Sequence, residues 1–299
     1  MTLEESIKNI YTKHSLKLLL LPLVIILLTA YIIYNQVATT GDIFNKDVSL
    51  AGGTVATVTT DKPVDIAQLE NDLSSKFSGI SVKRLAEFGS NRQIGIIVET
   101  SETDDKILKV DLEEKLGIKL TDENYSVEVT GSSVGSAFYK QMIRALAISF
   151  LFMTIVVFIF FRSLVPGFAA VASALFDILA TVAVVNLIGI KISPAGIAAF
   201  LMLIGYSVDT DILQTTRVLK KREASPVEGV VSSIKTGLTM TITSIVAVVL
   251  GYIFSTSIVF KEMFLIITVG LFIDIIMTYF MNAPLLIAYM NRKAAKQNA

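Results

Sequence analysis

The sequence predicts an α-helical polytopic membrane protein with six transmembrane helices and an extracytoplasmic α+β domain of the ferredoxin-like type. Three observations lead to this fold class: repeated long apolar runs, segregated charge, and one long connection with alternating strand and helix patterns. The chain has 299 residues, of which 53% are hydrophobic and 17% charged, against about 25% charged in ordinary soluble domains. Its mean hydropathy of +0.66 is typical of a membrane protein.

Six apolar runs are long enough to cross a bilayer, which takes roughly 20 helical residues. They cover residues 16–35, 142–161, 167–190, 194–214, 237–254 and 263–290. The first run lacks a clear small-x-small cleavage site, so we interpret it as a retained anchor and not as a signal peptide. The predicted division is a cytoplasmic N-terminus 1–15, a first transmembrane helix 16–35, an outer domain 36–141, the five-helix remainder 142–290 and a cytoplasmic tail 291–299.

Basic residues are unevenly distributed between the two predicted sides of the membrane. With the N-terminus inside, the inner tails and loops hold twelve Lys and Arg residues, whereas the two short outer loops hold only Lys191 and Lys261. This distribution follows the positive-inside rule. We therefore predict a multi-pass protein of the cell (cytoplasmic) membrane with both termini cytoplasmic.

Residues 36–141 form a connection too long and too patterned for a structureless loop. The segment carries 17 acidic and 11 basic residues, a net charge of −6. Strand and helix patterns follow in the order GGTVATVTT, VDIAQLENDLSSKF, ISVKRLAEF, RQIGIIVET, DDKILKVDLEEKL and YSVEVTG. We expect Asp65 near the start of the first helix, Gly117 at the end of the second, and a turn at Gly89-Ser90-Asn91. The order β-α-β-β-α-β is that of the ferredoxin-like split motif.

Acidic residues interrupt three of the apolar runs. Asp177 and Asp274 lie near the middle of the third and sixth runs. Asp209 lies about 22 Å along the helix that Pro194 opens, which places Asp209 and Asp211 in the inner third of the membrane. Intramembrane acids usually face the interior of a bundle or a hydrated cavity. The depth of these residues makes them candidate functional groups, and a buried structural polar group is the alternative for Asp177.

The stretch IGYSVDTDILQTTR has two polar faces, because residues two apart on a helix point in different directions. On one face lie Ser207, Asp211, Gln214 and Thr215; on another lie Gly205 and Asp209. We predict that Asp211 faces the bundle interior and that Asp209 faces the basic inner loop, which Arg217 begins. The alternative for the aspartate pair is a helix end whose acids reach the membrane surface.

Several classes of chemistry are excluded by composition. The chain has no Cys and a single histidine, His14, so disulfides, thiolate metal sites and a cysteine nucleophile are excluded. The segment GYSVD, from Gly205, lacks the second glycine of a nucleophile elbow. His14 precedes the first apolar run and cannot act as a base for Ser207 within the bundle. We predict no enzymatic activity, no cofactor and no metal site.

Five segments resemble the SecF branch of the SecD/SecF family of protein-export membrane proteins, which belongs to the RND superfamily. They are AAFLMLIGYSVDTDILQTTRVLKKR from Ala198, ALFDILATVAVVNLIGIKIS from Ala174, GGT at Gly52, VGSAF at Val134 and APLL at Ala283. The resemblance extends over nearly the whole chain, in order, with the same plan of six spans and one outer domain.

The chain also departs from the bacterial pattern of this family. Ser49-Leu50 replaces Asp-Phe before Gly52, Phe176 replaces a histidine, and the acid of the fourth span is displaced by one position. The fifth span offers only Thr239 or Met240 where bacterial relatives have an arginine. The resemblance is therefore to an archaeal-type SecF, and it does not carry over a proton pathway built on an Asp–Arg pair.

The resemblance implies an accessory subunit of the Sec protein-export machinery that assists polypeptide translocation across the membrane. The implied partners are a SecD-like protein, the Sec translocation channel, the translocating polypeptide and the lipid bilayer, with no nucleic acid. Proton-motive force supplies about 2.3 kcal/mol per charge per 100 mV, so acids at this depth are able to couple to it. The candidate coupling residues are Asp177, Ser207, Asp209, Asp211, Gln214 and Arg217; the motif residues with an expected structural role are Gly52, Gly53, Gly205, Tyr206 and Pro284.

Two other classes of function are compatible with the residues alone. One is an RND-like half-unit that transports small molecules or lipids, although a free-standing transporter of that kind would carry two such bundles in one chain. The other is a membrane-anchored scaffold whose outer domain only binds ligands. Polar residues at depth in three spans argue weakly against a passive anchor.

Overall fold

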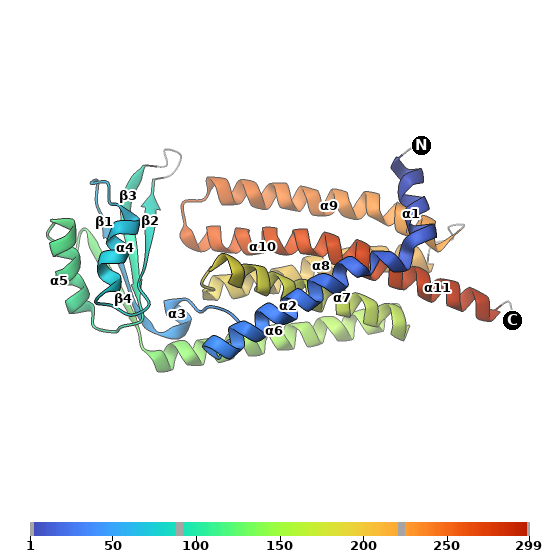
Figure 1. Ribbon diagram of the computed structural model, residues 1–299, viewed down its shortest axis with the longest axis horizontal. Coiled ribbons are helices and arrows are strands. Elements are labelled where there is room, and N and C mark those ends of the chain that lie inside the picture. The colour runs from blue at the N-terminus through green and yellow to red at the C-terminus, as the bar shows by residue number, and fades with distance from the viewer. Residues whose placement is uncertain (1–2, 88–91, 221–224, 298–299) are drawn as a thin grey trace.

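A computed structural model describes residues 3–87, 92–220 and 225–297 of the protein. It consists of a bundle of long helices with a small α+β domain at one end, and both described chain ends lie at the other end of the bundle (Figure 1). The turn predicted at Gly89-Ser90-Asn91 and the loop residues 221–224 lie outside the described residues.

Within the described residues, six stretches of helix are long and apolar enough to cross a membrane. Their elements are α1 (Leu3–Leu18) with α2 (Leu20–Thr40), α6 (Ser132–Phe161), α7 (Leu164–Ile188), α8 (Pro194–Lys220), α9 (Pro226–Phe254), and α10 (Ile258–Met277) continued by the π-helix η1 (Thr278–Asn282) and α11 (Ala283–Gln297). Several helices extend beyond the predicted runs, because an apolar run marks only the part of a helix that matches hydrocarbon. For example, Ser225 caps α9 twelve residues before its apolar run begins at residue 237, and its hydroxyl accepts from the Glu228 N–H.

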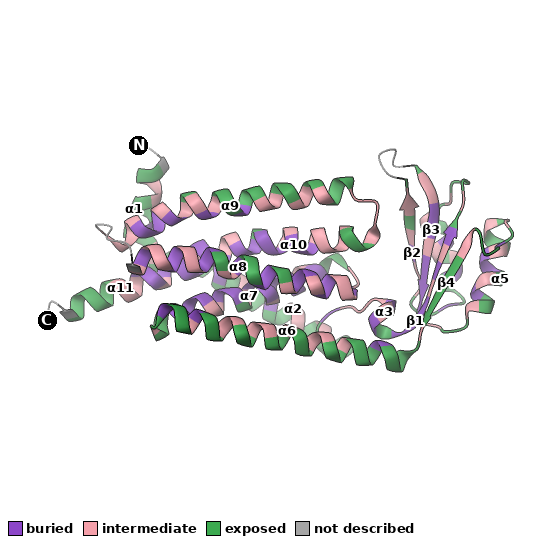
Figure 2. Ribbon diagram, turned by 180° about the vertical axis from the view of Figure 1, so that it is seen from behind, coloured by how far each residue is buried: buried purple, intermediate pink, exposed green. Residues whose placement is uncertain are grey.

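The centre of the bundle is formed by α7, α8 and α10, whose residues are largely buried, whereas α6 and α9 are exposed along much of their length (Figure 2). Helix α8 contacts α6, α7, α9 and α10. The apolar core of the bundle includes Phe200, Leu203, Ile266 and Ile267. The central helices therefore hold the polar residues that the sequence places at depth.

The N-terminal segment, predicted as a cytoplasmic tail, is helical. Helix α1 bends at His14, whose φ of −131° and ψ of 20° are not helical. It packs against α9 and α11, and Tyr11 is buried there with Val230 and Ile287. A helix with this amphipathic pattern packs its apolar side on the bundle while its polar side stays exposed.

The outer domain is built around a four-stranded antiparallel sheet in the described residues, with strand order β2-β3-β1-β4. The elements are β1 (Gly53–Thr59), α4 (Ile66–Ser74), β2 (Ser81–Ala86), β3 (Gln93–Thr100), α5 (Asp105–Leu116) and β4 (Tyr125–Thr130), preceded by a short α3 (Val48–Ala51). Helices α4 and α5 cover one face of the sheet, where Ala56, Val98 and Leu108 form a core. The order of these elements along the chain is the one that the sequence predicts.

Local signals explain where the two domain helices begin and end. The Asp65 carboxylate accepts a hydrogen bond from the Gln68 N–H at 3.1 Å and so caps α4. Gly117 ends α5 with a φ of 60°, a conformation that glycine adopts without a side-chain penalty.

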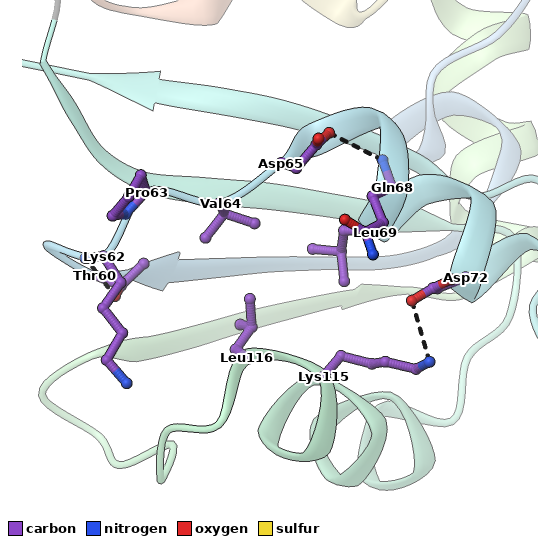
Figure 3. A pocket seen from close by; sticks show the side chains of 10 residues that line it. All are labelled: Thr60, Lys62, Pro63, Val64, Asp65, Gln68, Leu69, Asp72, Lys115 and Leu116. Atoms are coloured by element: carbon purple, nitrogen blue, oxygen red, sulfur yellow. Dashed lines mark hydrogen bonds and ion pairs between the residues drawn. The ribbon is translucent and has the colours of Figure 1, made fainter.

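A shallow cleft of about 220 Å³ lies between helices α4 and α5, and the Lys115–Asp72 ion pair of 3.1 Å bridges it (Figure 3). We interpret this cleft as a packing seam between α4 and α5.

Backbone hydrogen bonds join the outer domain to the outer ends of the bundle helices. The Ile192 N–H donates to the Asn45 carbonyl oxygen at 2.7 Å, and the Asp47 N–H donates to the Ile192 carbonyl oxygen at 3.0 Å.

On the sheet, Glu99 is buried and forms an ion pair with Lys83. Burial raises the pKa of the Glu99 carboxyl and the charge of Asp47 adds to the rise, while the Lys83 ammonium opposes it.

The Gly52-Gly53 pair lies where the base of the outer domain meets the start of α6. A Cβ on Gly52 would lie 2.5 Å from the Ser132 Cα, and a Cβ on Gly53 would lie 2.1 Å from the Thr100 carbonyl oxygen. Both glycines also have positive φ values, of 90° and 139°. Only glycine fits these two positions without moving the backbone.

We expect Gly53→Ala to lower the free energy of unfolding by about 2–4 kcal/mol, because it combines backbone strain with a steric clash. The matched control is Gly117→Ala, which also has a positive φ but has no atom within 4 Å of the new Cβ. This control should cost only about 1–2 kcal/mol. Denaturant unfolding of the detergent-solubilised protein measures both, and equal losses would contradict the packing explanation.

Candidate functional site

Three buried carboxyl groups meet in the centre of the bundle. Asp177 comes from α7, Asp211 from α8 and Asp274 from α10, and each is 0% exposed. Asp209, two residues before Asp211, is exposed on the other side of α8. The helical period therefore separates the two aspartates of α8, and only Asp211 reaches the interior.

Hydroxyl and amide groups donate to these carboxyls. The Ser207 hydroxyl donates to Asp177 Oδ2 at 2.5 Å, and the Asn282 amide donates to Asp211 Oδ1 at 2.7 Å. The Thr278 hydroxyl lies 3.3 Å from Asp211 Oδ1 and also 3.3 Å from Asp274 Oδ1. Asp211 Oδ1 and Asp274 Oδ1 therefore lie close to the same hydroxyl group. The Thr278 hydroxyl can donate its proton to only one of these two oxygens at a time, so Thr278 links the two carboxyl groups.

The cluster has more oxygen atoms than donors. Among the described residues, no ion pair involves any of the three carboxyls. In the same part of the chain, these buried atoms have no hydrogen-bond partner: Asp177 Oδ1, Asp211 Oδ2, Asp274 Oδ2, Gln214 Oε1 and Asn282 Oδ1. Three ionised carboxylates without a nearby cation are too costly in such an interior. The cluster must therefore hold protons or admit water.

The π-helix η1 lies beside the cluster, and one of its backbone carbonyls is left without a backbone donor. The Ala283 N–H donates to the Thr278 carbonyl oxygen, five residues back. The next donor in that pattern would be Pro284, which has no N–H, so the Tyr279 carbonyl oxygen is left without a backbone donor. The Tyr11 hydroxyl of α1 donates to this oxygen at 2.7 Å. π-Helical turns are frequent at functional sites.

The other predicted site residues divide between the interior and the surface. Gln214 is buried, and its amide donates to the Thr278 carbonyl oxygen at 3.3 Å. Gly205 and Tyr206 lie on the exposed side of α8 with Asp209. Asp209 forms no ion pair with the described residues, and the basic residues 221 and 222 lie outside them.

Arg217 binds α9 and not the aspartates. Its guanidinium donates to the Ser232 carbonyl oxygen at 2.6 Å and to the Thr236 hydroxyl at 2.8 Å. In the fifth span, Thr239 and Met240 are exposed, whereas Gly237 faces inward, where an added Cβ would lie 2.3 Å from the Tyr279 hydroxyl. Tyr279 thus occupies the space next to α9 that a larger inward-facing residue would need.

From the sequence, Asp274 is an acid near mid-membrane but is not among the candidate coupling residues, and Thr278, Asn282 and Tyr11 are not singled out. Asp274, Thr278 and Asn282 follow one another at intervals of four residues in the last apolar run, which is the spacing of one helix face. That interval is the signal that would have found them. Tyr11 precedes the first run and carries no such signal, because its contact depends on how α1 folds back.

No group of three or more carboxylate, imidazole or thiolate side chains is arranged to hold a metal ion in the described ranges. The cluster itself offers carboxyl, hydroxyl and amide groups. Such groups can exchange protons with one another and with water. They are also arranged on three different helices, so a change in protonation would change how these helices contact each other.

Comparisons with known proteins identify the family. The family model described as "Protein export membrane protein SecD/SecF, C-terminal" matches residues 113–292. The protein-export membrane protein SecF of Methanocaldococcus jannaschii is 36% identical over 258 residues, covering 84% of this chain and 89% of that protein. SecF of Pyrococcus furiosus is 33% identical over 297 residues, covering 99% and 98%. The chain belongs to the SecF family. The resemblance noted in the sequence is confirmed.

A solved structure supports the fold of this SecF family member. The crystal structure of SecDF, a translocon-associated membrane protein from Thermus thermophilus, matches with a TM-score of 0.74 at 20% identity. The match covers 97% of this chain but 40% of that chain, so the protein corresponds to less than half of the SecDF polypeptide. A SecDF structure in a form named super-membrane-facing matches with a TM-score of 0.56 at 19% identity.

We expect Tyr11→Phe to lower the free energy of unfolding by about 1–2 kcal/mol, because it leaves the Tyr279 carbonyl oxygen buried and unpaired. In a Pro284→Ala background the same change should cost less, since the new backbone N–H can donate to that oxygen. The double-mutant cycle measures this coupling. Tyr34→Phe, at a side chain that is 75% exposed, is the control and should be near neutral. Equal effects of Tyr11→Phe in both backgrounds would refute the role assigned to Pro284.

Proposed function

We propose that this chain is an accessory subunit of the Sec protein-export machinery and assists polypeptide translocation across the membrane. The observation that carries the proposal is the match to SecF of Pyrococcus furiosus, named a protein-export membrane protein, over 99% of this chain. The names of the relatives favour export over the alternatives of a transporter half-unit or a binding scaffold.

The proposed location is the cell membrane, with both termini cytoplasmic and the outer domain extracytoplasmic. The outer domain and the two chain ends lie at opposite ends of the bundle (Figure 1). The outer segment 36–141 has a net charge of −6, and the rest of the chain a net charge of +6, as the positive-inside rule favours. The strand order β2-β3-β1-β4 with two helices on one face supports assignment of this domain to the ferredoxin-like split motif.

The proposed partner within the membrane is a SecD-like protein. The chain corresponds to 40% of a SecDF polypeptide, which leaves room for a second bundle of similar size. Gly205, Tyr206 and Asp209 form an exposed patch on α8. A carboxylate facing lipid at this depth would be costly, so Asp209 is better accommodated against a partner helix. The Sec channel would be the further partner of the assembled pair.

The outer domain is the proposed contact with the emerging polypeptide. Strand β4 forms one edge of the sheet, and residues 126–129 of it are exposed. An exposed edge strand can add an extended chain through backbone hydrogen bonds without requiring a particular sequence. This property suits a protein whose substrates vary in sequence.

The carboxyl cluster is the proposed coupling element. Protonation of Asp177, Asp211 or Asp274 would change the hydrogen bonds that Ser207 and Thr278 make, and thereby the contacts between α7, α8 and α10. Entry and exit of a proton from opposite sides of the membrane would then drive a cycle of bundle conformations. Helices α2 and α6 connect the outer domain to the bundle, since α2 precedes the domain and α6 follows its last strand, so such a cycle would reach the domain.

Single-cysteine labelling tests the orientation, and the absence of native cysteine makes the labels unambiguous. A cysteine at position 110 of the outer domain, where Val110 is 61% exposed, should react with an impermeant maleimide from outside in intact cells. Cysteines at positions 222 and 296 should react only after the membrane is opened. The reverse pattern would be incompatible with the proposed topology.

Secretion of a reporter protein, at matched membrane abundance, tests the coupling residues. We expect Asp211→Asn and Asp177→Asn to reduce export by roughly tenfold or more, the scale of one charge moved through the membrane potential. Asp209→Asn should impair export less, because Asp209 lies outside the cluster. Each change keeps the size of the side chain. Export at the parental rate by both cluster variants would mean that these acids are structural.

A further inference from the structure

A long apolar groove lies on the surface of the bundle at the end that carries the chain termini. It has a volume of about 710 Å³ and runs between α7 and the segment formed by η1 and α11, beside Leu16. Ala169 and Ala172 form its floor, and their small side chains keep the groove open. Phe168 and Met281 are among the side chains of its walls.

One end of the groove is strongly basic. Arg292, Lys293 and Lys296 of α11 line it and are exposed. None of these three cations forms an ion pair with another described residue. Tyr289, at the same end, is held by a hydrogen bond of 3.1 Å between its hydroxyl and that of Ser163. The groove thus has apolar walls along its length and, at one end, three basic side chains that have no ion-pair partner among the described residues.

The position of the groove along the helices matches one leaflet of a bilayer. Val165 and Phe176 of α7 both line it, and eleven residues of helix separate them by about 16 Å. Half of a typical hydrocarbon core is about 15 Å. The groove therefore extends from the membrane surface to about the middle of the bilayer, with its basic rim at the surface.

We propose that this groove binds one anionic membrane lipid of the inner leaflet. An acyl or isoprenoid chain would lie along Ala169, Ala172 and Phe176, and the phosphate of the head group would pair with Lys293 and Lys296. An anionic head group is favoured over a zwitterionic one because three cations converge and none of them has an ion-pair partner in the part of the chain that the structure describes. Basic pockets between membrane helices on the cytoplasmic side are suited to such head groups.

The bound lipid would touch the part of the bundle next to the carboxyl cluster. Met281 lines the groove and belongs to η1, and the adjacent Asn282 donates to Asp211. Occupancy of the groove would therefore favour one packing of the π-helix. This inference concerns lipid binding alone and holds whether or not the protein acts in export.

A tryptophan reporter tests the proposal directly. The chain has no native tryptophan, so Phe168→Trp introduces a single fluorophore at a groove residue whose side chain is 70% exposed. The full chain carrying this change is reconstituted in phosphatidylcholine vesicles, with equal mole fractions of brominated phosphatidylglycerol or brominated phosphatidylcholine. Quenching by the anionic lipid should be several-fold stronger, and equal quenching by the two lipids would overturn the proposal.

Two lysine pairs provide the matched comparison. Lys293→Gln with Lys296→Gln should weaken the preference for phosphatidylglycerol by about fivefold for each lysine removed. Lys13→Gln with Lys235→Gln removes two exposed cations away from the groove and should leave the preference unchanged. The same loss in both pairs would reduce the effect to general surface charge and refute the site.

Filling the groove separates lipid binding in the groove from simple attraction to the basic tail. Ala172→Phe should abolish the preferential quenching while leaving the secondary-structure content, measured by circular dichroism, unchanged. Unchanged preferential quenching in this variant would place the lipid outside the groove and contradict the proposal. Occupation of the groove by a partner helix or a second copy would leave the fluorophore unquenched by either lipid, which would also contradict it.

Discussion

Three carboxyl groups that are buried in an apolar bundle, with no cation paired to them among the described residues, impose the main constraint on this structure. Each of Asp177, Asp211 and Asp274 is removed from solvent, and the penalty for burying such groups is offset only where hydrogen bonds meet them. The hydroxyls of Ser207 and Thr278 and the amide of Asn282 supply those bonds from neighbouring helices. The packing of α7, α8 and α10 is thus tied to polar chemistry at their centre.

The π-helix and the N-terminal helix belong to the same arrangement. The Tyr11 hydroxyl donates to the Tyr279 carbonyl oxygen of η1, and the Gln214 amide donates to the Thr278 carbonyl oxygen, which also accepts from the Ala283 N–H. Pro284 lies in the APLL segment, and its missing N–H leaves the Tyr279 carbonyl oxygen without a backbone donor. A segment that looks like a simple amphipathic tail therefore contributes a hydrogen bond beside the site. Loss of α1 packing would expose a backbone acceptor next to the carboxyl cluster.

The exposed surfaces of the bundle differ in what they can contact. Much of α6 and α9 is apolar and exposed, as expected for helices that face lipid. The exposed patch of Gly205, Tyr206 and Asp209 on α8 is polar at depth, and the groove beside α11 is apolar with a basic rim. A partner helix suits the α8 patch, because it would shield the Asp209 carboxylate from lipid. An anionic lipid suits the groove, because its head group would neutralise the basic rim.

The sequence alone determined the six spans, the order of elements in the outer domain and the family, because these depend on local apolar runs, alternation and motifs along one chain. It also indicated that Asp211 and Asp209 lie on different sides of α8, since the helical period decides that locally. Only the tertiary structure brought Asp177, Asp211, Asp274 and Asn282 together, because the order of helices around a bundle is not encoded in the period of any one helix. The contact of Tyr11 with Tyr279 and the binding of Arg217 to α9 likewise depend on packing between segments far apart in the chain.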